Sequence, residues 1–357
     1  MSTAVTLSIP ELFNPLRIKE ANDALSTLKL PALQTLLAKA DRFAAQPQSS
    51  YALSSYLFHQ PKFSKDSSAF AAIMAAAELN DYDRNAYWLR VDPVQMIADR
   101  DSLVLIPSND LAITEEESKA LLQAFNNHFE QDRVQLEFAS AQHWYLRMAL
   151  PVDLQTHSIE SLAYQPVDGR YPTGNAATYW RKMINETQML FFTHPVNEAR
   201  REQCMPEINS IWVWGEGQLT DSSIVERRDA MVWSDNLYLK GLATLAQSQL
   251  ASSPSCYQAW QDSVNAQQER GGEKISHHMI QLDPLTNALD NMQQSEWIEA
   301  LKQLETTWFD PLMNALKQGE IDSLLFEFGS ASRYHLKPTH LNRFWRFKST
   351  LNNALQK

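Results

Sequence analysis

Cysteine and glycine are both scarce in this chain of 357 residues, and each shortage excludes a class of site. The only cysteines, Cys204 and Cys256, form no Cys-x-x-Cys pair, so neither a disulfide framework nor a cysteine-rich zinc site is supported. Of the nine glycines, none precedes Gly169. Phosphate-binding glycine loops of the Rossmann and Walker types are therefore excluded from the chain before that residue.

Basic residues are outnumbered as well, 31 against 42 acidic ones, which gives a net charge of −11. Nucleic acids and anionic membrane surfaces select a basic face, so we expect neither as a partner. The first ten residues lack the basic and apolar stretches of a signal peptide, and no apolar run reaches the roughly 18 residues of a membrane span. These features favour a cytoplasmic protein.

Apolar spacing predicts helices over 28–43, 176–193 and 296–317, because apolar residues recur there at intervals of three and four. Pro195 is expected to end the second of these helices. The polar stretch 262–276 predicts irregular structure.

A strand is predicted over 210–214, and both of its faces are apolar. Ile211 and Val213 share one face, and two tryptophans share the other. Strands that are buried on both sides are typical of the interior of an α/β sheet. The following Gly215-Glu-Gly217 is expected to break the strand.

An ordered set of motifs follows the predicted helix: His194-Pro-Val-Asn197, then Arg200, then Pro206-Glu-Ile-Asn209, then Trp212-Val-Trp214-Gly-Glu-Gly217. This order resembles the pattern of archaeal-type cofactor-independent phosphoglycerate mutases, which belong to the alkaline phosphatase superfamily.

Three further segments, Asp92-Pro-Val, His143-Trp-Tyr-Leu-Arg147 and Asn185-Glu-Thr-Gln-Met-Leu, are more similar to a bacterial branch of that family. Its members are labelled phosphoglycerate-mutase-like or regulatory proteins of the RPFE type. The second segment stands where the mutases have Tyr-Arg-His-Leu-Leu, with its basic residues in different slots. The detailed resemblance covers roughly residues 85–217.

The resemblance implies an α/β fold. Its alkaline-phosphatase-like core would have a central, mostly parallel sheet and would be interrupted by an inserted α+β module. The core would comprise residues 1–84 and 166–357, and the module residues 85–165.

The mutases of this family hold two divalent metal ions with Asp and His ligands, because paired metals stabilise both the attacking and the leaving oxygens of a phosphoryl group. Their motifs are an Asp-Gly pair after the first strand, an Asp-x-x-x-His run and an Asp-His pair after a late strand. Here the first strand region has Ile9-Pro10-Glu11, and the late strand Leu324–Gly329 ends without Asp-His. We therefore expect no metal ion and no cofactor.

The alternative is a set of relocated ligands for two manganese or zinc ions. His277, His278, Asp283 and Glu327 are the first candidates, although the spacing of the histidines matches neither the family motif nor a helical pair.

The residues expected to bind a ligand are polar side chains of the matching segments: His194, Asn197, Arg200, Arg147, Asn185 and His143. An arginine fork and an asparagine amide suit phosphate or carboxylate oxygens in a cleft between core and module. The structural alternative is that His194 and Asn197 tie down the end of a helix. In the same way, Arg147 would pair with an acidic neighbour, and Asn185 would lie on a solvated helix face.

These observations favour a degenerate phosphoglycerate mutase homologue, a pseudoenzyme that binds a small phosphorylated or carboxylated metabolite or acts as a regulatory protein. Two alternatives stay open. One is an active phosphoglycerate mutase or phosphatase, and the other is an adaptor with a protein partner. The catalytic residues, if any, are not identified by the sequence.

Overall fold

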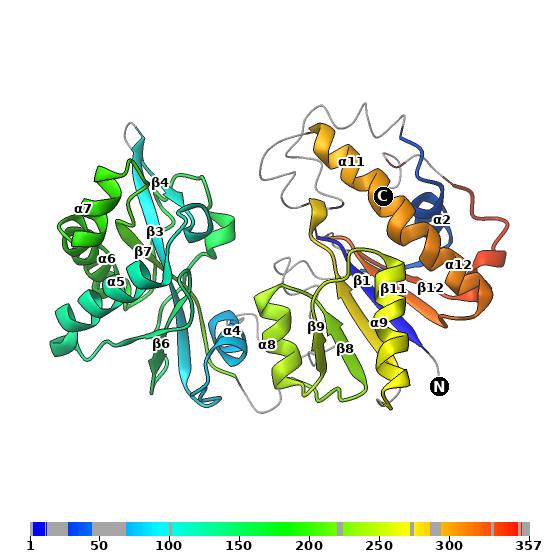
Figure 1. The fold of residues 1–357 in the computed structure, drawn as a ribbon, viewed down its shortest axis with the longest axis horizontal. Helices are drawn as coiled ribbons and strands as arrows, with labels where there is room; N and C mark the ends of the chain where they lie inside the picture. Colours follow the sequence, from blue (N-terminus) through cyan, green and yellow to red (C-terminus); the bar gives the residue numbers. More distant parts are fainter. Residues whose placement is uncertain are drawn as a thin grey trace. The chain divides into compact units, whose positions relative to one another are not determined.

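The computed structural model describes residues 3–10, 12, 28–44, 69–99, 102–219, 224–271, 275–285, 294–329, 332–348 and 351 (Figure 1). The chain forms two compact units, one made of residues 1–59 and 224–357 and the other of residues 60–223. Each unit has its own sheet and its own hydrophobic core. No helix in the described part of the chain is long and apolar enough to cross a membrane.

The first unit is built on a sheet in which the first strand of the chain is central. The order is β2 (Asp41–Ala44), β12 (Ser332–Leu336), β11 (Ser323–Glu327), β1 (Ala4–Ser8), β10 (His277–Gln281), β8 (Ala230–Trp233) and β9 (Gln249–Ala251). The strands from β11 to β9 are parallel to one another. Strand β12 is antiparallel to both of its neighbours, β11 and β2.

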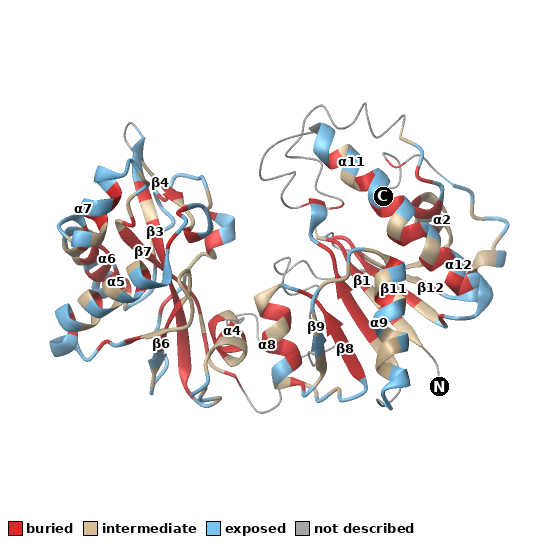
Figure 2. Cartoon of the chain, in the orientation of Figure 1, coloured by how far each residue is buried: buried red, intermediate tan, exposed pale blue. Residues whose placement is uncertain are grey.

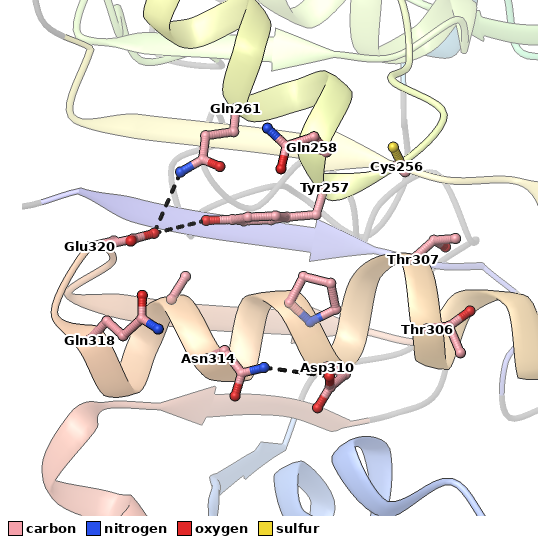
Figure 3. Close-up of a pocket in the computed structure, with 12 residues that line it drawn as sticks. Cys256, Tyr257, Gln258, Gln261, Thr306, Thr307, Asp310, Asn314, Gln318 and Glu320 are labelled. Carbon is pink, nitrogen blue, oxygen red and sulfur yellow. Dashed lines mark hydrogen bonds between the residues drawn. The ribbon is translucent and has the colours of Figure 1, made fainter.

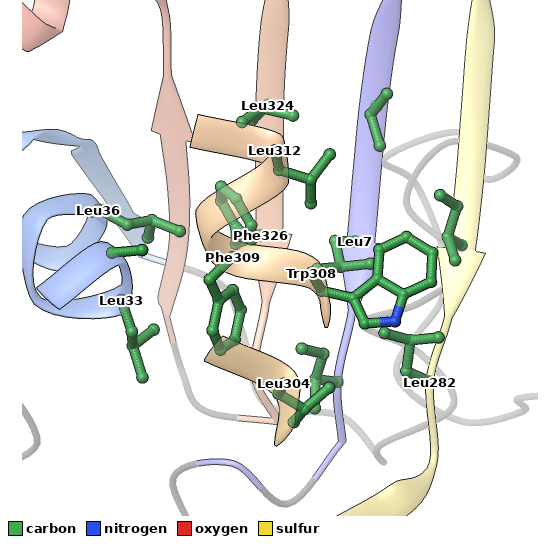
Figure 4. Close-up of a cluster of buried hydrophobic side chains, with 14 of the residues drawn as sticks. Leu7, Leu33, Leu36, Leu282, Leu304, Trp308, Phe309, Leu312, Leu324 and Phe326 are labelled. Atoms are coloured by element: carbon green, nitrogen blue, oxygen red, sulfur yellow. The ribbon is translucent and has the colours of Figure 1, made fainter. Parts of the chain in front are cut away.

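Helices cover this sheet and contribute part of its core. They are α2 (Pro31–Lys39), α8 (Leu237–Leu245), α9 (Tyr257–Glu269), α11 (Gln294–Leu304) and α12 (Asp310–Gln318). A π-helical turn, Glu305–Phe309, joins α11 to α12. Figure 4 shows Trp308 and Phe309 of this turn packed over Leu7 and Phe326 of the sheet. The buried residues lie on the strands and on the helix faces that meet them (Figure 2).

The π-helical turn also holds the start of α2. Leu30, which precedes that helix, provides no side-chain cap. Instead, the buried Glu305 accepts hydrogen bonds from the backbone N–H groups of Ala32, at 2.5 Å, and Leu33, at 3.1 Å. A helix start leaves such N–H groups without partners inside the helix, and its dipole favours a negative charge there. Glu305 therefore links two segments that are far apart in the sequence.

The second unit is an antiparallel sheet with helices on both faces. Its strands are β3 (Tyr87–Asp99), β4 (Ser102–Ile106), β5 (Leu136–Phe138), β6 (Trp144–Met148) and β7 (Ser210–Gly217), and its helices are α4 (Phe70–Glu78), α5 (Glu115–His128), α6 (Ala177–Phe192) and α7 (Pro195–Glu202). The long strand β3 pairs with β4, β6 and β7. Residues of α5 and α6 pack on one face of the sheet, and α4 lies against β3 and β7.

The second unit is larger than the module of 85–165 expected from the sequence. It contains residues 166–223 because β7 pairs with β3 and α6 packs on the same sheet. The assignment of 210–214 to the interior of the α/β sheet is wrong, since β7 belongs to the separate antiparallel sheet. Its two apolar faces are buried by helices on both sides of this antiparallel sheet, a situation that the sequence pattern does not distinguish from a parallel sheet.

The sequence predicts that the glycines after Trp214 break the strand. This prediction is wrong, because β7 continues to Gly217. Gly217 has φ +157°, and a Cβ atom there would lie 2.5 Å from the Cα atom of Ala69. The glycine therefore permits the close approach of the chain at the start of α4 to the strand.

Among the helices, 176–193 is confirmed as α6, and Pro195 both follows it and opens α7. The helix expected over 28–43 is wrong beyond residue 39, because Asp41–Ala44 pairs with β12 as strand β2. The prediction of irregular structure over 262–276 is also wrong for residues 262–269, because α9 extends to Glu269. In the first case, pairing with a distant strand overrides a local helical signal.

Replacing Glu305 by alanine should lower the free energy of unfolding by about 1–3 kcal/mol, because two N–H groups lose their buried acceptor. Glu299→Ala, at an exposed position of α11, is the matched control and should change it by less than about 0.5 kcal/mol. Urea denaturation measures both. Equal effects of the two variants would contradict the capping role of Glu305.

Candidate functional site

The carboxyl edge of the parallel strands gathers buried polar residues in the first unit. Ser8, the last residue of β1, is in register with Gln281 of β10 and with Glu327 of β11. All three residues are buried. Open parallel sheets bind their ligands outside the carboxyl ends of the strands, which makes this edge the candidate site.

Glu327 is a buried carboxyl group beside a guanidinium. Its Oε1 atom lies 2.9 Å from Nε of Arg333 on the neighbouring antiparallel strand β12. Burial raises the pKa of Glu327 to about 8, although Arg333 acts in the opposite direction. The group therefore takes up a proton at a higher pH than an ordinary glutamate does.

Two aspartates lie in the loops that follow β8 and β10. Gln281 donates hydrogen bonds to both carboxyl oxygens of Asp283, at 3.1 and 3.2 Å, and the backbone N–H of Ser253 donates to Asp235 at 3.3 Å. The pKa of Asp283 is raised because the surrounding protein removes its carboxyl group from water and because Asp235 is negatively charged. The negative charges of the two aspartates therefore repel each other.

The paired histidines of β10 face different surroundings, as expected for adjacent strand residues. Nε1 of Trp233 donates to Nδ1 of the buried His278 at 3.2 Å, and burial lowers the pKa of His278 to about 4. His277 instead lies 3.4 Å from Asp229. Within the described residues, no three His, Cys, Asp or Glu side chains come together in a way that would hold a metal ion.

Three of the expected ligand-binding residues lie in α7 or at its start, in the second unit. Each forms hydrogen bonds with other groups of the protein. His194 caps this helix by accepting from the N–H of Val196 at 3.2 Å. The buried Asn197 donates to the carbonyls of Phe191 and Ile208, both at 2.9 Å, and accepts from the N–H of Ile208 at 2.8 Å. These contacts agree with the structural alternative for both residues.

Arg200 is also buried and fastens α7 to α5. Its Nη1 atom lies 2.8 Å from Glu117, and it donates further hydrogen bonds to the carbonyls of Pro206 and Leu111. Glu117 in turn forms a capping box with Thr114 at the start of α5. All three partners of the guanidinium belong to the protein, so Arg200 connects secondary-structure elements.

The remaining expected residues are not brought together with these. His143 places Nδ1 2.7 Å from Glu78 of α4, and the hydroxyl of Tyr145 donates to the same carboxyl group at 2.6 Å. Arg147 lies 3.2 Å from Glu137 and 3.6 Å from Asp81. Asn185 is exposed on α6.

The second unit also contains a buried polar trio, formed by Arg90, Asp92 and Trp214. Nε of Arg90 donates to Asp92 at 2.8 Å, Nε1 of Trp214 donates to the same carboxylate at 2.7 Å, and the guanidinium lies 5.1 Å from the tryptophan ring centre. The signal in the sequence is two charged residues, two positions apart, within an otherwise apolar strand. A buried charge needs a partner, and this spacing supplies one on the same face.

Comparison with known proteins connects this architecture to solved structures. No protein-family model matches the chain, and no curated protein matches it either. The cofactor-independent phosphoglycerate mutase from Thermoplasma acidophilum DSM 1728 is 12% identical, with a TM-score of 0.52, and the match covers 99% of this chain and 95% of that one. The PH0037 protein from Pyrococcus horikoshii is 14% identical, with a TM-score of 0.57, and the match covers 94% and 87%.

At these identities the likeness shows the fold alone. The mostly parallel central sheet with a separate antiparallel sheet is the alkaline-phosphatase-like fold of phosphoglycerate mutases, so the fold class expected from the sequence is confirmed. The resemblance to this fold family is confirmed to the same extent, and the RPFE-type branch stays a prediction.

Replacing Asn197 by alanine should cost about 2–4 kcal/mol of unfolding free energy, because buried backbone groups of Ile208 and Phe191 lose their partners. Asn185→Ala, at an exposed position of α6, should change it by less than about 0.5 kcal/mol. Chemical denaturation of both variants tests the assignment. A neutral Asn197→Ala would show that this amide is not needed for folding.

Glu327 should make the protein less stable as the pH rises. Its pKa in the folded state, about 8, exceeds the ordinary value of 4.5, so the folded state binds more protons between these values. The free energy of unfolding should fall across that window by up to about 1.4 kcal/mol per pH unit from this group. Urea denaturation at several pH values should show a shallower slope for Glu327→Gln than for the parent or Glu299→Gln. Parallel slopes would refute this.

Proposed function

We propose that this chain is a phosphoglycerate-mutase-like protein that works without a two-metal site, as a metabolite-binding or regulatory protein. The fold supports the first part of this proposal. The observation that carries the second part is the pairing of Glu327 with Arg333 at the carboxyl edge of the sheet.

Metal ligands must be deprotonated and must point at a shared cation. Glu327 meets a guanidinium instead, and its raised pKa makes it a weak metal ligand at neutral pH. Asp283 and Asp235 also accept hydrogen bonds from protein donors. Arg333 thus supplies positive charge at the edge of the sheet, where a two-metal enzyme would place its ions.

The ligand we propose is a small phosphorylated or carboxylated metabolite. The Thermoplasma neighbour is by name a phosphoglycerate mutase, so a compound that carries both groups is the natural first probe. A guanidinium recognises the oxygens of either group. Arg333 offers this chemistry at the edge of the sheet.

An active mutase or phosphatase is the second candidate, and one observation favours it. Burial and, to a smaller extent, the charge of Asp235 raise the pKa of Asp283, and the two aspartates follow strands β8 and β10 at the same edge. A divalent cation, manganese or zinc, would remove that repulsion. This candidate requires the ion to displace the donors that now bond to these carboxylates.

Metal analysis and a turnover assay on the purified protein separate the candidates. We expect no stoichiometric metal and no interconversion of 3- and 2-phosphoglycerate, with or without added manganese. Millimolar 3-phosphoglycerate should raise Tm through preferential binding to the folded state. The shift should vanish in Arg333→Gln and persist in Arg228→Gln, a control at an exposed arginine.

Two metal ions per chain together with turnover would overturn the proposal in favour of an active enzyme. A protein without turnover and without any thermal shift would overturn the metabolite-binding part and favour an adaptor with a protein partner.

A further inference from the structure

A groove in the first unit runs between α9 and the continuous helix formed by the π-turn and α12 (Figure 3). Its volume is about 540 Å³. This value lies within the range of about 300–1,000 Å³ that is usual for small-molecule sites. None of the carboxyl-edge residues discussed above lines it, so it is separate from the candidate site.

Helical spacing explains why one wall of the groove is polar. Asp310, Asn314 and Gln318 follow one another at intervals of four and therefore share one face of α12. The π-turn before them directs Thr306 and Thr307 to the same groove. Turns of this kind are rare and occur often at functional sites.

The opposite wall and one end carry further hydrogen-bonding groups. Gln258 and Gln261 of α9 line the groove, and Glu320 lies at its end. The carboxylate of Glu320 faces the hydroxyl of Tyr257, at 3.3 Å, and the amide of Gln261, at 3.5 Å. Burial and the negative charge of Glu320 raise the pKa of Tyr257 to about 12, so its hydroxyl keeps its proton.

A smaller cavity of about 220 Å³ extends the groove, because Tyr257, Gln261 and Glu320 line both. Its lining adds Asn265, Gln268 and Trp260. Trp260 is 4% exposed, and its indole Nε1 has no hydrogen-bond partner among the described residues. An indole N–H is only a donor, so it needs an acceptor.

The lining selects among ligand classes. Of the described residues around either cavity, His278 alone belongs to a basic type, and burial keeps it neutral. Asp310 and Glu320 therefore disfavour an anion such as a phosphorylated metabolite. A polyamine can donate to these carboxylates but offers no acceptor to the glutamine amides or the indole. Hydroxyl groups both donate and accept.

We propose that this groove binds an uncharged polyhydroxylated compound, namely a sugar or a short oligosaccharide. The carboxylates of Asp310 and Glu320 accept from its hydroxyls. The amides of Asn314, Gln318 and Gln258 donate to its oxygens and accept from its hydroxyls in turn.

Saturation-transfer NMR on the full-length protein tests this with glucose, maltose and maltotriose as probes, each at millimolar concentration. We expect transfer to at least one of them. In the double variant Asn314→Leu/Gln318→Leu the affinity should fall by at least about tenfold. Gln303→Leu, at an exposed glutamine of α11, is the matched control and should bind as the parent does. Circular dichroism confirms that both variants are folded.

The proposal is overturned if no probe receives saturation, or if transfer is equally strong in the double variant. It is also overturned if spermidine or 3-phosphoglycerate, and no sugar, gives transfer that the double variant abolishes. Because the groove is separate from the carboxyl edge, none of these results decides whether Arg333 binds a metabolite.

Discussion

The first unit depends on the in-register parallel pairing of β1 with β10 and β11. Because β1 is central, its register decides which residues of three distant segments meet at the carboxyl edge. A shift of one residue would exchange the two faces of the strand and move Leu7 out of the core. The same register that buries Leu7 therefore places Ser8 beside Gln281 and Glu327. Core packing and the candidate site are two results of one alignment of strands.

Electrostatics at this edge differ from those of a site prepared for cations. One carboxyl group lies beside a guanidinium, and two others accept hydrogen bonds from a primary amide and a backbone N–H. The second unit uses the same principle inside its sheet, where Asp92 is satisfied by Arg90 and Trp214. In both units a buried carboxyl group is tied to a strand neighbour, which limits the cost of removing charge from water.

Sequence patterns identified the features that depend on neighbouring residues. The helix expected over 176–193 is confirmed as α6, because its apolar spacing and the following Pro195 are local signals. The pattern could not show that Asp41–Ala44 is a strand, since its partner β12 lies almost 300 residues away. The motif around His194 and Asn197 suggested a binding site, yet Asn197 bonds to backbone groups up to eleven residues away. An asparagine that satisfies a turn and one that binds a ligand look alike in a sequence.

The contact between Glu305 and the start of α2 has a consequence for the order of folding. Residues 60–223 form a continuous stretch, so this unit has all of its strands once the ribosome has passed them. The other unit must wait, because β1 is flanked by strands from the last third of the chain and α2 is capped from there as well. The amino-terminal segment therefore leaves the ribosome long before its partners exist, and its apolar residues remain exposed to aggregation and to chaperones during that interval.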